Sequence, residues 1–152
     1  MAYTTIDNPE LYFQTKLYTG TGSSNSVTLD GSEDMQPDLV WIKVRSNSTH
    51  GHNLYDSVRG VNKPLQSDST SAEGNDASGG NTSLNSFDSD GFTLGGFYNK
   101  VNQSGQTFVA WNWKASGSTS SDSNGSITST ISANTTAGFS IVTYQEQGQM
   151  LQ

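Results

Sequence analysis

The amino-acid sequence predicts an all-β protein: a sandwich of short strands followed by a C-terminal β-strand arm. Ser, Thr, Asn and Gly fill 70 of the 152 positions, and all four residue types lower helix propensity. Apolar residues recur at every second position in several runs, as they do in strands with one buried face. Short turn sequences separate these runs at the intervals typical of a sandwich.

The first half of the chain carries four predicted strands. The pattern is clearest in the third of them, where every second residue from Val40 to Val44 is apolar. Trp41 lies on the opposite side of that strand, next to two basic residues, so we expect it to be partly exposed. The four predicted strands are residues 13–19, 26–29, 38–45 and 53–58.

A predicted hairpin opens the second half. Residues 83–87 and 92–94 are short alternating runs, and Asp88-Ser-Asp-Gly91 separates them. Asp-Gly between two such runs is a strong signal for a tight turn. We therefore expect these two strands to pair directly.

The last strand of the predicted sandwich spans residues 107–114 and carries two tryptophans. Val109, Trp111 and Trp113 share one face of it. Alternating strand aromatics supply most of the hydrophobic mass in a chain this poor in Leu and Ile, so we interpret Trp111 and Trp113 as core residues. The alternative is a platform with Trp41 on which sugar rings stack.

We divide the chain into three parts. Residues 1–115 form the sandwich domain and include a low-complexity loop over 67–81 that is too polar to bury. Residues 116–125 have the composition of a flexible linker. Residues 126–152 form the arm, whose assembly residues are Ile127, Ile131, Phe139, Ile141 and Tyr144.

The arm echoes the first strand, because Phe139 and Tyr144 have the same spacing as Phe13 and Tyr18. We interpret it as a truncated second repeat. A strand behind a linker has unpaired backbone groups and must pair with something. The candidates are an edge of its own sandwich, a neighbouring subunit and a larger assembly.

The charge and composition of the chain restrict the classes of partner that we expect for it. The formal net charge is −7 and the pI about 4.4, which disfavours a nucleic-acid surface. The sequence has no apolar run long enough to cross a bilayer and no secretory signal. Cysteine is absent, so the fold does not rely on disulfides. We expect a protein made in a cytoplasm, with no nucleic-acid partner and no membrane insertion.

The sequence contains no catalytic signature. It has neither a G-x-S-x-G elbow nor a thiol. His50 and His52 alternate and would need a third ligand from elsewhere to bind a metal, so we interpret them as polar loop histidines. Asp88 and Asp90 resemble the start of a calcium loop but lack its later acidic positions, and a hydrogen-bonded turn explains them. We expect no cofactor and no metal, and the candidate ligand-binding residues are Trp41, His50, His52, Asp88 and Asp90.

Five segments together resemble a repeat domain found in tail-fibre and other virion proteins of marine tailed bacteriophages, notably phages of cyanobacteria. The resemblance covers residues 3–115 and implies a jelly-roll or concanavalin-like sandwich without established catalytic residues. The segments are Tyr12-Phe-Gln-Thr-Lys-Leu-Tyr-Thr-Gly-Thr-Gly22, Gln36-Pro-Asp-Leu-Val-Trp-Ile-Lys-Val-Arg-Ser46, Leu54-Tyr-Asp-Ser-Val-Arg-Gly60, Phe87-Asp-Ser-Asp-Gly-Phe92 and Phe108-Val-Ala-Trp-Asn-Trp-Lys-Ala115.

The function that we expect is that of a virion structural protein exposed on the particle, as a tail or fibre component or a capsid decoration. Its partners would be other virion proteins, with homo-oligomerisation or a place in a larger assembly. A lectin-like module that binds host surface glycans is the alternative, and virion appendages can combine both roles. An enzyme that degrades host polysaccharide is a third hypothesis. The carboxylates that it would need lie in polar loops, where we interpret them as solvated; they are Glu33, Asp34, Asp68, Glu73 and Asp76.

Overall fold

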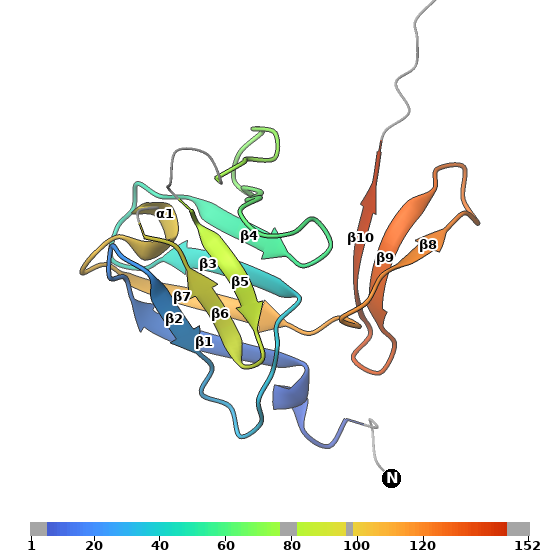
Figure 1. Ribbon diagram of the computed structural model, residues 1–152, viewed down its shortest axis with the longest axis horizontal. Helices are drawn as coiled ribbons and strands as arrows, with labels where there is room; N and C mark the ends of the chain where they lie inside the picture. Colours follow the sequence, from blue (N-terminus) through green and yellow to red (C-terminus); the bar gives the residue numbers. More distant parts are fainter. Residues whose placement is uncertain (1–5, 77–81, 97–98, 146–152) are drawn as a thin grey trace, which may run out of the picture.

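A computed structural model describes residues 6–76, 82–96 and 99–145 of the chain (Figure 1). Within these ranges it has ten strands in three antiparallel sheets, together with a short 3-10 helix, η1 (Pro9–Leu11), and one turn of α-helix, α1 (Asn99–Asn102). No described helix is long and apolar enough to span a membrane.

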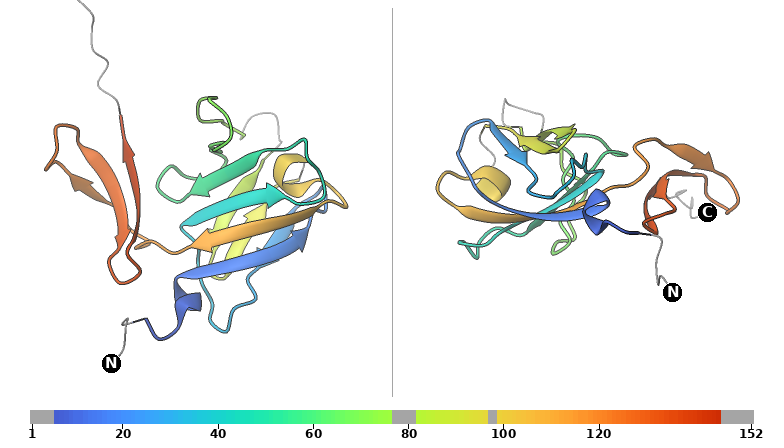
Figure 2. Two further views of the ribbon diagram at one scale, coloured as in Figure 1. Left: turned by 180° about the vertical axis from the view of Figure 1, so that it is seen from behind. Right: turned by 90° about the horizontal axis from the view of Figure 1, so that it is seen from below.

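Two of the sheets form the sandwich. Sheet A contains β1 (Phe13–Thr19), β7 (Thr107–Trp113), β3 (Leu39–Val44) and β4 (His52–Asp56), in that spatial order. Sheet B contains β2 (Asn25–Thr28), β6 (Gly91–Leu94) and β5 (Leu84–Asp88). The two sheets lie face to face (Figure 2), and the prediction of an all-β sandwich is confirmed.

The hydrophobic core fills the space between these two sheets. Sheet A contributes every second residue of β3 together with Phe108 and Ala110 of β7, and sheet B contributes Phe92 and both leucines of the β5–β6 hairpin. Tyr18 closes one end, where its ring stacks on Phe108 and its hydroxyl donates to the Val101 carbonyl at 2.7 Å. The core residues are Val27, Val40, Ile42, Val44, Tyr55, Leu84, Phe92, Leu94, Val101, Phe108 and Ala110.

The two faces of β7 differ from the sequence interpretation. Phe108, Ala110 and Asn112 are fully buried and point into the core, whereas Trp111 and Trp113 are only partly buried on the outer face. The assignment of these two tryptophans to the core was therefore wrong. Alternation separates the two faces of a strand correctly, but the inner face here takes a polar residue. Asn112 is accommodated because its amide donates to the Gln14 and Ala110 carbonyls, at 3.2 and 3.3 Å.

The C-terminal part of the chain forms a third sheet of its own, sheet C. It contains β10 (Phe139–Tyr144), β9 (Ser129–Asn134) and β8 (Ser120–Asp122), in that order. The range 116–125, which we predicted to be a flexible linker, therefore includes a strand. The strands of the arm pair within the chain, with each other and not with an edge of the sandwich. The interpretation of residues 126–152 as a truncated second repeat stays a prediction.

Sheet C is held at the end of β7, beside one end of the sandwich (Figure 1). The backbone N–H of Ser116 donates to the Ser132 hydroxyl at 3.2 Å, and the Asn134 amide reaches the Lys114 and Ala115 carbonyls. The Phe139 ring stacks on Trp113, with 6.1 Å between ring centroids. This ring pair brings sheet C against the outer, aromatic face of sheet A.

Candidate functional site

Six aromatic rings run in contact across the outer face of sheet A and onto sheet C. The strand register produces this arrangement, because Trp41 of β3 pairs with Trp111 of β7 and Phe13 of β1 pairs with Trp113. Residues that pair across strands lie on the same face. We call this set the aromatic track, and its members are His52, Trp41, Trp111, Trp113, Phe13 and Phe139.

Trp41 is the centre of the track. Its ring centroid lies 5.6 Å from that of Trp111, in an edge-to-face arrangement, and 6.4 Å from that of Trp113, in a stacked one. The ring centroids of Phe13 and Trp113 lie 4.9 Å apart. Phe13 remains 38% exposed and the tryptophans are partly exposed, so the track is a solvent-facing surface and not an extension of the core.

A hydrogen bond fixes the His52 end of the track. The indole Nε1 donates to His52 Nδ1 at 2.8 Å. Because Nδ1 accepts, the neutral imidazole carries its proton on Nε2. Trp41 and His52, two of the predicted site residues, are thus brought together. His50 lies in the preceding loop, where its carbonyl accepts from Lys43 and its Nε2 lies 3.3 Å from Gln103 Oε1.

Asp68 adds a carboxylate beside this end. Its Oδ1 accepts the backbone N–H of His52 at 3.1 Å, and this hydrogen bond lowers the pKa of the Asp68 carboxyl below its ordinary value. Gly51 allows the approach, since a Cβ there would lie 2.3 Å from Asp68 Oδ2. In the sequence, Asp68 is one of several carboxylates in polar loops that we interpret as solvated, because nothing in such a loop indicates which of its residues folds back onto a strand.

The opposite end of the track opens into a pocket of about 350 Å³. Sheet A supplies Phe13 and Trp113 to its wall, and sheet C supplies Phe139. The chain before β1 closes the remaining side with Ile6, Pro9 and Tyr12. Pockets of roughly 300–1,000 Å³ with mostly apolar walls are typical small-molecule sites.

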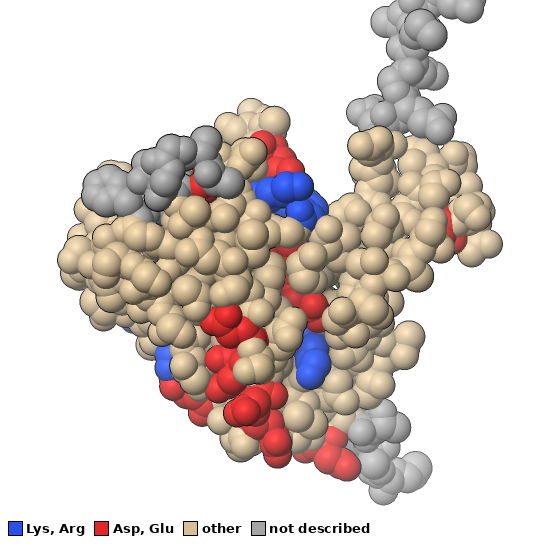
Figure 3. All heavy atoms as spheres, viewed as in Figure 1, with Lys and Arg blue, Asp and Glu red and all other residues tan. Residues whose placement is uncertain are grey.

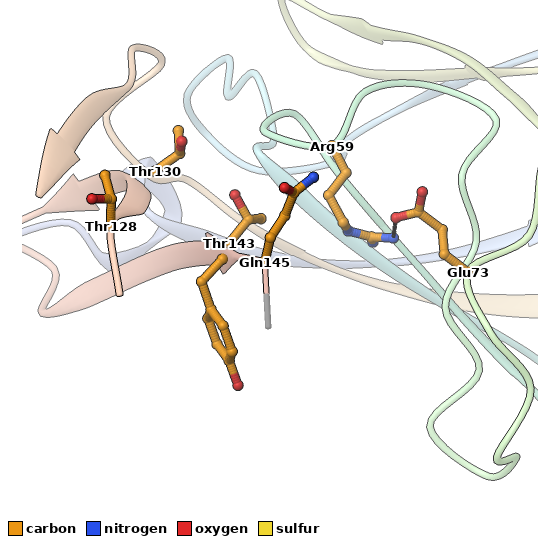
Figure 4. A pocket seen from close by; sticks show the side chains of 7 residues that line it. Arg59, Glu73, Thr128, Thr130, Thr143 and Gln145 are labelled. Atoms are coloured by element: carbon orange, nitrogen blue, oxygen red, sulfur yellow. Dashed lines mark hydrogen bonds and ion pairs between the residues drawn. The ribbon is translucent and has the colours of Figure 1, made fainter. Parts of the chain in front are cut away.

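A second hollow, a cleft of about 490 Å³, separates the sandwich from the upper part of sheet C (Figure 4). Arg59 and Glu73 form the sandwich wall, and Thr128, Thr130 and Thr143 form the sheet C wall. The Arg59 guanidinium is held by contacts within the sandwich. Its Nε and Nη1 contact the Asp56 and Glu73 carboxylates at 2.5 and 3.0 Å, and both Nη atoms also donate to backbone carbonyls.

A further group of acidic residues lies elsewhere. Carboxylates gather over the turn between β5 and β6 and the loop before β3 (Figure 3). Asp88, the last residue of β5, accepts from the hydroxyls of Ser86 and Thr93 at 2.6 and 2.7 Å. Asp90 lies in the turn that follows and accepts from the backbone N–H of Met35 at 3.3 Å. Both predicted site residues therefore lie at the β5–β6 turn and make hydrogen bonds within the sandwich. Among the described residues no three His, Cys, Asp or Glu side chains cluster as metal ligands would.

The predicted assembly residues divide between the two faces of sheet C. Phe139 and Ile141 face the junction with the sandwich, and Ile141 is 8% exposed. Ile131 pairs with Val142 on the opposite face, where Ile127 and Tyr144 lie around a shallow hollow. We call this second set, Ile127, Ile131, Val142 and Tyr144, the outer apolar patch. Val142 was missed by the sequence analysis, although its alternation with Ile141 indicates its face.

A family described as a domain of unknown function (DUF7483) matches residues 8–152. The chain belongs to this family. The match runs without a break across the sandwich and sheet C, so the DUF7483 family includes both. No curated protein and no solved structure shows a significant match to the chain.

Proposed function

We propose that this DUF7483 protein is a non-enzymatic structural component of a bacteriophage virion, exposed on the particle and joined to its neighbours through sheet C. The sequence resemblance to virion repeat domains supports the virion role. The observation that carries the assembly role is the outer apolar patch beside an open strand edge. The location is the virion, in the tail or fibre apparatus or as a capsid decoration.

Exposure and strand order support sheet C as the joining element. Val142 is 47% and Tyr144 67% exposed. They lie on β10, whose edge away from β9, on the side toward the sandwich (Figure 1), has no strand partner among the described residues. Natural edge strands are usually protected by charges, proline or short length. β10 has six residues with none of these devices, whereas the other edge, β8, has three residues and ends at Asp122. β10 is therefore the edge suited to strand addition.

A charge placed on β10 should abolish assembly without unfolding the protein. Val142→Lys adds an ammonium to the outer apolar patch, and we expect the full chain to change from an oligomer to a monomer in sedimentation velocity. Val61→Lys is the matched control, because Val61 is 39% exposed on the sandwich, and it should assemble like the native chain. Both variants should melt at nearly the native temperature.

Two results would overturn the proposal separately. If the chain is missing from purified particles by mass spectrometry, the virion role is wrong. If Val142→Lys assembles as the native chain does, or if the native chain is itself monomeric at all concentrations, sheet C is not the joining element.

A further inference from the structure

We propose that the aromatic track and its terminal pocket form a binding site for an extended, neutral oligosaccharide. The site has two parts: a run of partly exposed rings across sheet A, and a pocket of about 350 Å³ where that run meets sheet C. The inference is independent of how the protein assembles, since the outer apolar patch lies on the far face of sheet C.

The partial exposure of these rings itself indicates a ligand. Placing three indoles on the solvent side of a sheet forgoes the burial that would stabilise a core, and contiguous exposed apolar surface in a soluble protein marks a contact site. A pyranose presents an apolar C–H face of ring dimensions with hydroxyls around its rim. Indole and phenyl faces complement this C–H face. The rings of the track are already held in place by their mutual contacts around Trp41.

Polar groups stand where the sugar rim would lie. Thr15 occupies the same cross-strand row as Trp111 and is exposed. At the far end, the His52 ring carries an Nε2–H donor because its Nδ1 accepts from Trp41. The Asp68 carboxylate, whose Oδ1 accepts the His52 backbone N–H, supplies acceptor oxygens at the same end. A donor and an acceptor next to an aromatic face are the groups that fix the orientation of a bound hydroxyl-rich ligand.

The net charge favours a neutral oligosaccharide over an acidic one, because a chain with a formal net charge of −7 repels a polyanion. The rings extend from His52 to Phe139. An oligosaccharide, which can contact several of them at once, is therefore favoured over a single sugar.

The experiment uses the full chain and a panel of neutral hexasaccharides built from glucose, galactose, mannose or N-acetylglucosamine, measured by isothermal titration calorimetry. We expect saturable binding to at least one member, at least about tenfold tighter than to its monosaccharide, because the oligosaccharide contacts several rings of the track at once. Trp41→Ala and Phe139→Ala should each weaken binding by about tenfold or more. Val61→Ala, which removes an exposed apolar side chain that belongs to neither the aromatic track nor its pocket, should bind normally.

Phe139→Ala keeps the test informative if Trp41→Ala misfolds. Phe139 lies outside the sandwich core, and its loss removes one wall of the pocket. Three results would overturn the inference: no binding to any panel member, equal binding by the Trp41→Ala and Phe139→Ala variants, or a native oligomer that Trp41→Ala converts to a monomer. The last result would assign the aromatic track to self-association.

Discussion

Replacing Phe108 with alanine should lower the free energy of unfolding by about 3–5 kcal/mol, the range for a large aromatic residue removed from a packed core. Phe108 is fully buried, and its ring stacks on Tyr18 with 5.1 Å between centroids. Its loss opens a cavity between sheets A and B and also removes the contact that holds Tyr18 under Val101. Urea unfolding of the native chain and the variant measures the difference.

Trp111→Ala is the matched control for this prediction, since Trp111 lies three residues further along the same strand. It removes a larger side chain, but from the partly exposed outer face, so the destabilisation should be less than half that of Phe108→Ala. If Trp111→Ala destabilised the protein as much as Phe108→Ala or more, the assignment of the two faces of β7 would be wrong.

Asp38→Ala should lower the free energy of unfolding by about 3 kcal/mol, because two hydrogen bonds to a buried carboxylate are lost. Asp38 is 2% exposed at the start of β3. Its Oδ1 accepts from the Ser57 hydroxyl and its Oδ2 from the backbone N–H of Ala115, both at 2.8 Å. The substitution leaves that N–H buried without an acceptor, at the point where the chain leaves β7 for sheet C.

The control for this change is Asp34→Ala, which removes an exposed carboxylate four residues earlier and should change the free energy of unfolding by no more than about 0.5 kcal/mol. Asp38→Asn keeps an acceptor for Ala115 and should be intermediate. Equal stability of the Asp38→Ala and Asp34→Ala variants would show that Asp38 does not stabilise the junction between β7 and sheet C.

The strands of the sandwich follow from the sequence because their signals are local. Residues 13–19 were predicted as a strand and coincide with β1, and the turn at Asp88–Gly91 joins β5 and β6 as the Asp-Gly signal indicates. β8 was not predicted as a strand, and the reason is its composition. Its three residues are polar and form a strand only because β9 offers backbone partners.

The site was predictable only in part. The sequence separates Trp111 and Trp113 from Phe108 by face, but which face turns inward depends on the residues of sheet B that meet it, such as Phe92 and Leu94. The pairing of Trp41 with Trp111 depends on strand order, since β3 and β7 are far apart in the chain. The contact of Phe139 with Trp113 depends on how sheet C docks, which no local pattern encodes.

Sheet A carries the core on one face and the aromatic track on the other, and acrylamide quenching of tryptophan fluorescence tests this division most directly. The chain has three tryptophans, and all three belong to the track. We expect acrylamide to quench the emission of the folded protein to a substantial fraction of the quenching seen after unfolding in urea. Emission that resists acrylamide until the protein unfolds would place the indoles in the core and contradict the account.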